Sequence, residues 1–423
     1  MEPASPPPQE ASFRWLWLGQ LISNLGTQCS LYGLGLWWFA QRGRLVDFAA
    51  VAFVVQLAKV LVVPLLGRWL GRWPSGRVMV LANAVGALCT LGLAALLLWV
   101  RQPVPWLLLL LLALAAMAEA ALVLRFASLI PVLVREPRQL AQANGLFATA
   151  DGLVLSVAPF AGSGLVALAG LPGVLLADGL SFAVAMVCVL AARLPVRWAS
   201  PFQPPRAPLG LRPLLAQPAS RAVLVLGTAM ALAYAAIEVL FPAWVFAGLG
   251  PSRLPLALLL AAAGYLLGFQ LWSRWAWRRP GSVLPLCLVL QSLILMGAGL
   301  VVFQDWLVFW YGGLLTFSLS LPVAYSALQT LWQRLVPADA LPQLLAQRYR
   351  LEWFARLAAF AGAAALVDGL LRPALAWPFW PQWLTASLGT GPGRPLAVGL
   401  GAMGWLLLLA LCSQRSSMAR CRF

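Results

Sequence analysis

Twelve long apolar runs, separated by short basic or proline-containing stretches, dominate this chain of 423 residues. Each run is long enough to cross the hydrocarbon core of a bilayer as a helix, which takes about 20 residues. Charged residues make up only 10% of the chain, whereas a soluble domain carries about a quarter, so this chain cannot coat a water-facing globule. The sequence therefore predicts an all-α membrane protein with spans near 13–39, 46–66, 78–100, 104–126, 141–168, 172–192, 221–247, 255–277, 283–303, 306–330, 345–370 and 395–412.

The basic residues lie mainly in the loops on one side of the predicted membrane. Of the 29 basic residues, 21 fall on one side and six on the opposite side, while Lys59 and Arg356 fall within spans. The positive-inside rule places the basic side, and with it both termini, in the cytoplasm. The net charge of +17 is then a topology signal, so we expect a multi-pass protein of the cell (inner) membrane without a nucleic-acid partner.

A weak internal repeat divides the chain into two halves. "PLLGRW" (64–69) matches "YLLGFQLW" (265–272), and "LAQANGL" (140–146) matches "LAQRYRL" (345–351). In transporters built from such repeats the substrate site lies between the halves near the midplane. The predicted organisation is a disordered cytoplasmic tail, a six-helix bundle, a basic proline-interrupted cytoplasmic linker, a second six-helix bundle and a tail, at 1–12, 13–192, 193–220, 221–412 and 413–423.

Five local motifs, in this order, resemble the major facilitator superfamily, and within it the drug-exporter branch that contains macrolide-efflux and enterobactin-export proteins. They are "GQLISNLGTQCS" (19–30), "ASLIPVLVREPRQLAQANGL" (127–146), "LLADGLSFAVA" (175–185), "LVDGLLRPAL" (366–375) and "GTGPGR" (389–394). The resemblance covers residues 13 to 412. It implies the major facilitator fold, twelve helices in two six-helix bundles, and the activity of a secondary transporter.

The resemblance fails at one position of a cytoplasmic loop, "GRWLGRWPSGR" (67–77). The family signature there has a glycine, three residues, an aspartate, an arginine and a basic cluster. Gly67, Arg72 and Arg77 match it, but Gly71 stands at the position of the aspartate. In the family this aspartate helps to latch the loop in one gating state. Its absence implies altered gating, a substitute contact or degraded transport activity.

Three carboxylates fall inside predicted spans, where ionisable groups are costly and mark function by default. They are Asp151 in the fifth span, Glu238 in the seventh and Glu119 in the fourth. Each is either a proton carrier or a neutral or paired acid that ties helices together. Asp178 follows a short outer loop, and we expect it at the membrane interface.

Two basic residues within spans require partners. Glu352 and Arg356 are four residues apart with the acid first, which favours a local ion pair. Lys59 lies in the inner half of its span, where an unpaired ammonium is costly. Because the second helix packs beside the eleventh in the resembled fold, we expect Lys59 to bridge to Glu352, with Arg356 competing. Asp151 is the alternative partner of Lys59.

Two further patterns concern the transport path. Polar residues form a stripe on the first span that is either a cavity wall or an interhelical hydrogen-bond seam; they are Gln20, Ser23, Asn24, Thr27 and Gln28. "APFAGSG" (158–164) resembles the fifth-helix motif of family antiporters in Pro159, Gly162 and Gly164. The second pattern favours export over import.

Several chemistries are not expected. The chain has no histidine and no metal-binding cysteine pattern, so neither a metal nor a nucleophile–base catalytic set is predicted. The only lysine follows "VVQLA", which excludes a phosphate-binding loop, so no nucleotide cofactor is expected. The expected function is export of a small amphipathic molecule (a drug, macrolide-like compound or peptide natural product) by proton antiport, carried out by a monomer in the lipid bilayer. The alternatives are a lipid or lysolipid flippase and a non-transporting membrane scaffold.

Overall fold

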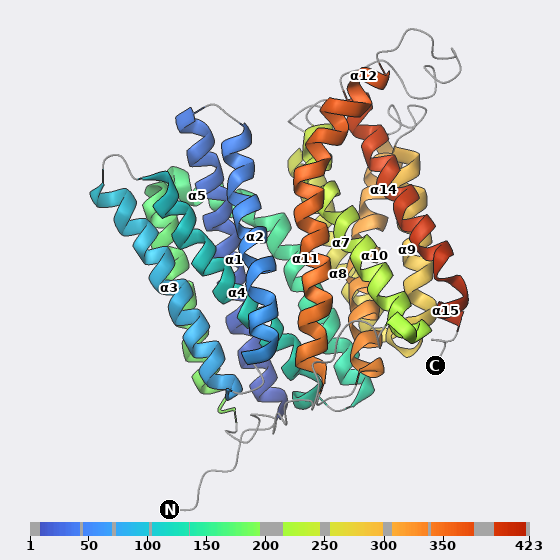
Figure 1. The fold of residues 1–423 in the computed structure, drawn as a ribbon, viewed down its shortest axis with the longest axis horizontal. Helices are drawn as coiled ribbons and strands as arrows, with labels where there is room; N and C mark the ends of the chain where they lie inside the picture. The colour runs from blue at the N-terminus through green and yellow to red at the C-terminus, as the bar shows by residue number, and fades with distance from the viewer. Residues whose placement is uncertain are drawn as a thin grey trace, which may run out of the picture. The chain divides into compact units, whose positions relative to one another are not determined.

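The computed structural model describes residues 9–42, 45–69, 73–100, 104–134, 136–194, 215–245, 254–298, 307–336, 340–375 and 393–419. Every regular element within these ranges is a helix, and none of their residues lies in a strand (Figure 1). The predicted all-α fold class is thereby confirmed.

The longer helices follow the predicted apolar runs. They are α1 (Gln9–Arg42), α2 (Leu45–Trp69), α3 (Ser75–Trp99), α4 (Pro105–Leu133), α5 (Pro137–Ala191), α7 (Pro218–Trp244), α8 (Leu254–Arg274), α9 (Pro280–Ala298), α10 (Leu307–Leu335), α11 (Leu341–Ala364) and α14 (Arg394–Ser413). Short helices complete the described residues: the 3₁₀ helix η5 (Ala276–Arg278), the π-helix η7 (Ala365–Leu371), α12 (Arg372–Leu375) and α15 (Arg415–Ala419).

Helix α5 contains two of the predicted spans. Its 55 residues would extend about 80 Å, far more than the roughly 30 Å of a hydrocarbon core. The helical path breaks at Gly170, whose φ of 66° suits a residue without a Cβ, and Pro172 follows. The segments before and after this break, 137–169 and 171–191, match the fifth and sixth predicted spans.

Eight helices of the described part are long and apolar enough to cross a membrane, or nine with the bent α11–η7–α12 segment. If α5 crosses twice and α1 and α2 each cross once, the described helices supply all twelve predicted crossings. Many leucines on these helices are exposed, for example Leu88, Leu180 and Leu286. Apolar surfaces of this extent suit contact with lipid and not with water.

The chain forms two compact units. Unit 1 contains Met1–Ala143, Leu153–Pro213 and Val336–Arg350, and unit 2 contains Asn144–Gly152, Leu214–Leu335 and Leu351–Phe423. The first part of α11 thus belongs to unit 1, and a short stretch of α5 belongs to unit 2. The predicted domain boundaries in the linker and tails stay predictions, because most of the linker lies outside the described residues.

In unit 1, α4 packs against both α2 and α3. Helix α1 lies close to the second segment of α5, because glycines face it. A Cβ on Gly19 would lie 2.8 Å from the Cβ of Cys188, and one on Gly26 would lie 2.7 Å from Oδ1 of Asp178. The two glycines are seven residues apart, or two helical turns, so they lie on one face of α1.

Unit 2 is held together by buried polar contacts as well as apolar packing. The Tyr234 hydroxyl of α7 donates to Oε1 of Gln291 on α9, and Nε2 of Gln291 donates to Ser320 Oγ on α10 at 2.9 Å. Asn144 of α5 donates to Thr330 Oγ1 at 3.0 Å and to Gln333 Oε1 at 2.7 Å, both on α10. Interhelical hydrogen bonds of this kind hold membrane helices together, where the hydrophobic effect does not.

Candidate functional site

Lys59 and Glu119 form an ion pair in unit 1. The Nζ atom of Lys59 on α2 lies 2.7 Å from Oε1 of Glu119 on α4, and the two side chains are 10% and 18% exposed. The pair exists because α2 packs against α4. Two candidates that the sequence predicted separately are therefore partners, and each offsets the cost of burying the other's charge.

This pairing gives Lys59 a partner within unit 1 that the sequence did not name. Neither Glu352 nor Asp151 belongs to unit 1; both belong to unit 2. Glu352 is buried there and faces α7, where a Cβ on Gly227 would lie 2.5 Å from its Oε1. A bridge between Lys59 and Glu352 would join the two units and stays a prediction.

Asp178 is a functional candidate whose burial the sequence did not predict. It is 0% exposed, and its expected position at the membrane interface stays a prediction. The helix resumes directly after Gly170, so Asp178 lies about two turns inside the second segment of α5, opposite Gly26. Thr27 Oγ1 donates to its Oδ1 at 3.3 Å, and Ser181 Oγ lies 3.2 Å from the same atom. Among the described residues, Oδ2 has no hydrogen-bond partner.

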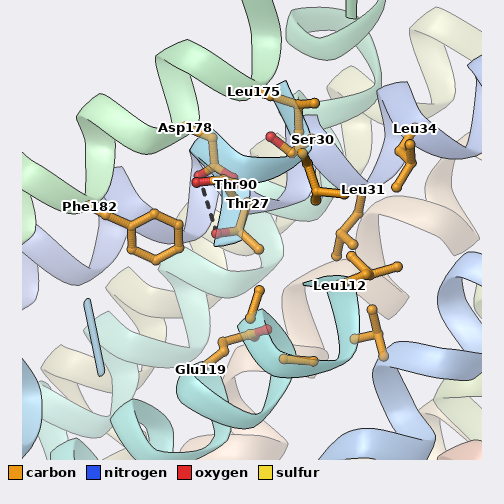
Figure 2. Close-up of a pocket in the computed structure, with 14 residues that line it drawn as sticks. Thr27, Ser30, Leu31, Leu34, Thr90, Leu112, Glu119, Leu175, Asp178 and Phe182 are labelled. Carbon is orange, nitrogen blue, oxygen red and sulfur yellow. Dashed lines mark hydrogen bonds between the residues drawn. The ribbon is translucent and has the colours of Figure 1, made fainter. Parts of the chain in front are cut away.

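A small cavity joins Asp178 to the ion pair. Figure 2 shows Asp178 and Glu119 on its wall, together with side chains of α1 and α3. The polar lining residues are Thr27, Ser30, Thr90, Glu119 and Asp178, and the remainder are apolar. The volume is about 20 Å³, which is about enough for one water molecule. A drug-sized ligand needs several hundred Å³, so this cavity is too small to hold one.

A second ion pair lies in unit 2. Nη2 of Arg356 on α11 donates to both carboxylate oxygens of Glu238 on α7, at 3.0 and 2.8 Å. The guanidinium also lies over the Phe360 ring, 5.7 Å from its centroid, in a cation–π contact. The side chains of Arg356 and Glu238 are 20% and 32% exposed.

The second pair corrects the predicted role of Arg356. The sequence paired it with Glu352, one helical turn away on α11, but its guanidinium contacts an acid on a neighbouring helix. Glu238 is accordingly a paired acid, one of the two possibilities that the sequence left open. Asp151 is half-buried and is an electrostatic neighbour of Arg356 and Tyr265, as Glu238 also is. Asp151, Glu238 and Arg356 therefore form one cluster in unit 2.

Part of the polar stripe of α1 forms an interhelical hydrogen-bond seam with α5. Thr27 bonds to Asp178, and Ser23 is buried, whereas Gln20, Asn24 and Gln28 are half-buried. For these last three, a cavity wall and a hydrogen-bond seam remain alternatives.

The antiporter-like motif lies on α5. Pro159 lies inside this helix, a Cβ on Gly162 would lie 3.2 Å from the Cys29 carbonyl oxygen, and one on Gly164 would meet open space.

The loop at 67–77, which lacks the family aspartate, has another contact. Arg125, a buried residue of α4, donates from Nη2 to the Trp73 carbonyl oxygen at 3.0 Å. Arg77 is exposed at the start of α3, and Gly67 lies in the last turn of α2. Gly71 and Arg72 lie outside the described residues. The Arg125 contact is a candidate for the substitute contact that the loop sequence predicted.

No group of three or more His, Cys, Asp or Glu side chains within the described ranges is arranged to hold a metal ion. The candidate functional groups are instead an ion pair and a buried acid in unit 1, and a partly exposed ion pair with a nearby acid in unit 2. Ionisable groups inside helices that cross a membrane are typical of transporters.

Residues 16–349 match the family described as Major Facilitator Superfamily. The chain belongs to this superfamily, and it has the fold of a secondary transporter. No curated protein matches the sequence.

Solved structures show the same fold. A bacterial homologue of the iron transporter ferroportin in an outward-facing state superposes with a TM-score of 0.71 at 18% identity, covering 97% of this chain and 99% of that chain. The human organic anion transporter MFSD10 (TETRAN) superposes with a TM-score of 0.66 at 16% identity, covering 96% of this chain and 100% of that chain.

Proposed function

We propose that this protein is a secondary active transporter that exports a small amphipathic molecule, such as a drug, a macrolide-like compound or a peptide natural product, by proton antiport. The observation that carries the proposal is an acid–base pair on the apolar helices of each unit, buried in unit 1 and partly exposed in unit 2, since ionisable groups are costly in a membrane and mark coupling or substrate paths. The only lysine of the chain is engaged in an ion pair inside α2, where it cannot serve a phosphate-binding loop. An ion gradient is therefore the proposed energy source.

The experiment that tests this function uses the full chain in proteoliposomes. An acidic lumen should drive accumulation of a fluorescent amphipathic dye, and a protonophore should abolish that accumulation. Asp151→Asn, which removes a carboxyl beside Arg356, should lower gradient-driven accumulation at least about tenfold, equivalent to about 1.4 kcal/mol. Normal gradient-driven accumulation by Asp151→Asn would place coupling on another acid.

The two alternative functions give different results in the same vesicles. A lipid or lysolipid flippase would move a fluorescent lysolipid between leaflets and leave the dye outside. The tryptophan-rich stretch that motivates it, 376–389, lies outside the described residues. A scaffold would move neither probe and would tolerate loss of both Asp151 and Glu238.

We also propose a monomer in the cell (inner) membrane with both termini in the cytoplasm, on the basis of the arginine distribution. Single cysteines placed within 200–210 should be labelled only from the cytoplasmic side, and those within 384–392 only from outside. The measurement is labelling by a membrane-impermeant maleimide in intact cells and in inverted vesicles, in a background without the exposed Cys412. Labelling of both segments from one side would refute the twelve-span topology.

A further inference from the structure

The two oxygens of the Asp178 carboxylate have unequal surroundings. Oδ1 lies near two hydroxyls, but the single Ser181 hydroxyl proton has a shorter acceptor in the Asp178 backbone carbonyl, at 2.7 Å against 3.2 Å to Oδ1. Thr27, at 3.3 Å, is therefore the main donor to Oδ1, and Oδ2 has none among the described residues. An ionised carboxylate buried with so few donors is strongly disfavoured, so the site favours either a bound proton or a polar partner at Oδ2.

The cavity does not supply that partner. Ser30 is a neighbour of the Asp178 carboxylate, but its Oγ, like Oδ2, forms no hydrogen bond of normal geometry within the described residues. Both residues line the cavity, but each of these two oxygens exposes less than 1 Å², and most of the lining is apolar, so the cavity does not place a water against Oδ2. A bound proton is therefore the better match for Oδ2.

The charges around the cavity favour a proton over a metal cation. The titratable groups facing Asp178 are Glu119 on α4 and the Cys29 thiol on α1, and Glu119 is balanced by Lys59 of α2. A hard cation prefers about six oxygen ligands, whereas most residues of this wall are apolar. A proton neutralises Asp178 without requiring further ligands.

We propose that Asp178 is a proton-binding residue of unit 1. The protonated carboxyl group is neutral, whereas the ionised form would add a second negative charge to a cavity wall that already holds Glu119. A role of this proton in transport rests on the proposed antiport, whereas the binding of the proton does not.

The test is infrared difference spectroscopy of the purified full chain during a pH titration, with a repeat in D₂O. The wild type should show the carbonyl stretch of a protonated carboxyl group that disappears as pH rises, and Asp178→Asn should lose this band. Glu136→Gln is the matched control, because Glu136 is an exposed acid before α5, and it should keep the band. Persistence of the band in Asp178→Asn, or a response to Na⁺ in place of pH, would overturn the proposal.

A second variant covers the case in which Asp178→Asn does not fold. Thr27→Val keeps the acid but removes the main hydrogen-bond donor to Oδ1, which makes the carboxylate form less favourable. It should move the midpoint of the band upward by about 0.4–1 pH unit, the value of one hydrogen bond; an unchanged midpoint contradicts the proposal. Because the band is read without transport, a wild type that shows it but exports no dye refutes the antiport and leaves the proton site intact.

Discussion

Lys59→Met should destabilise the protein by about 3–5 kcal/mol, the usual cost of removing one partner from a buried ion pair. The cost arises because Glu119, at 18% side-chain exposure, would keep its charge with little water and no ammonium at 2.7 Å. The measurement is the thermal unfolding midpoint in detergent, together with the yield of monodisperse protein. Lys59→Arg keeps the positive charge and is the control, with a much smaller loss.

The double variant Lys59→Met/Glu119→Gln tests whether Glu119 is the partner of Lys59. It removes both charges, so it should recover most of the stability lost in Lys59→Met. A parallel cycle with Glu352→Gln tests the bridge that the sequence predicted between the two units. Recovery with Glu352→Gln and additive losses with Glu119→Gln would show that Lys59 acts across the units and not within unit 1.

The helices could be predicted from the sequence because each is a long apolar run bounded by charges, glycine or proline. Inside lipid, the backbone N–H and C=O groups have no water to bind and must pair with one another. An apolar run of this length therefore forms a helix. The loop aspartate position shows the limit of a motif. Gly71 shows that the family aspartate is absent from the loop. The contact to Trp73, by contrast, comes from the buried Arg125, 52 residues further along the chain, and no motif indicates that contact.

Helix neighbours could not be predicted, and the partners of the buried charges depend on them. Hydropathy identifies α2 and α4 as spans without showing that they touch, so Glu119 could not be chosen as the partner of Lys59. The burial of Asp178 could not be predicted because it depends on the packing of α1 against the second segment of α5, which hydropathy does not show. The i, i+3 spacing of Asp178 and Ser181 was an available signal, since it puts a carboxylate and a hydroxyl on one helical face.

Arg356→Leu should lower gradient-driven dye accumulation at least about tenfold, with a smaller loss of stability than Lys59→Met. The stability loss is smaller because Glu238 is 32% exposed and retains some hydration when its partner is removed. The transport loss is large because Arg356 joins α11 to α7 through both carboxylate oxygens and also lies near Asp151. Arg356→Lys keeps the charge but loses the planar guanidinium that lies over the Phe360 ring, so it should recover the transport only in part.

Two double-mutant cycles separate the partner seen in the structure from the partner expected from sequence spacing. Arg356→Leu combined with Glu238→Gln should give losses well below additive, since the second change removes the carboxylate that the first leaves unpaired. Arg356→Leu combined with Glu352→Gln should give additive losses in the unfolding midpoint. The reverse outcome would be losses below additive with Glu352→Gln and additive losses with Glu238→Gln. It would show that Arg356 pairs with Glu352 on its own helix and that Glu238 is available to carry a proton.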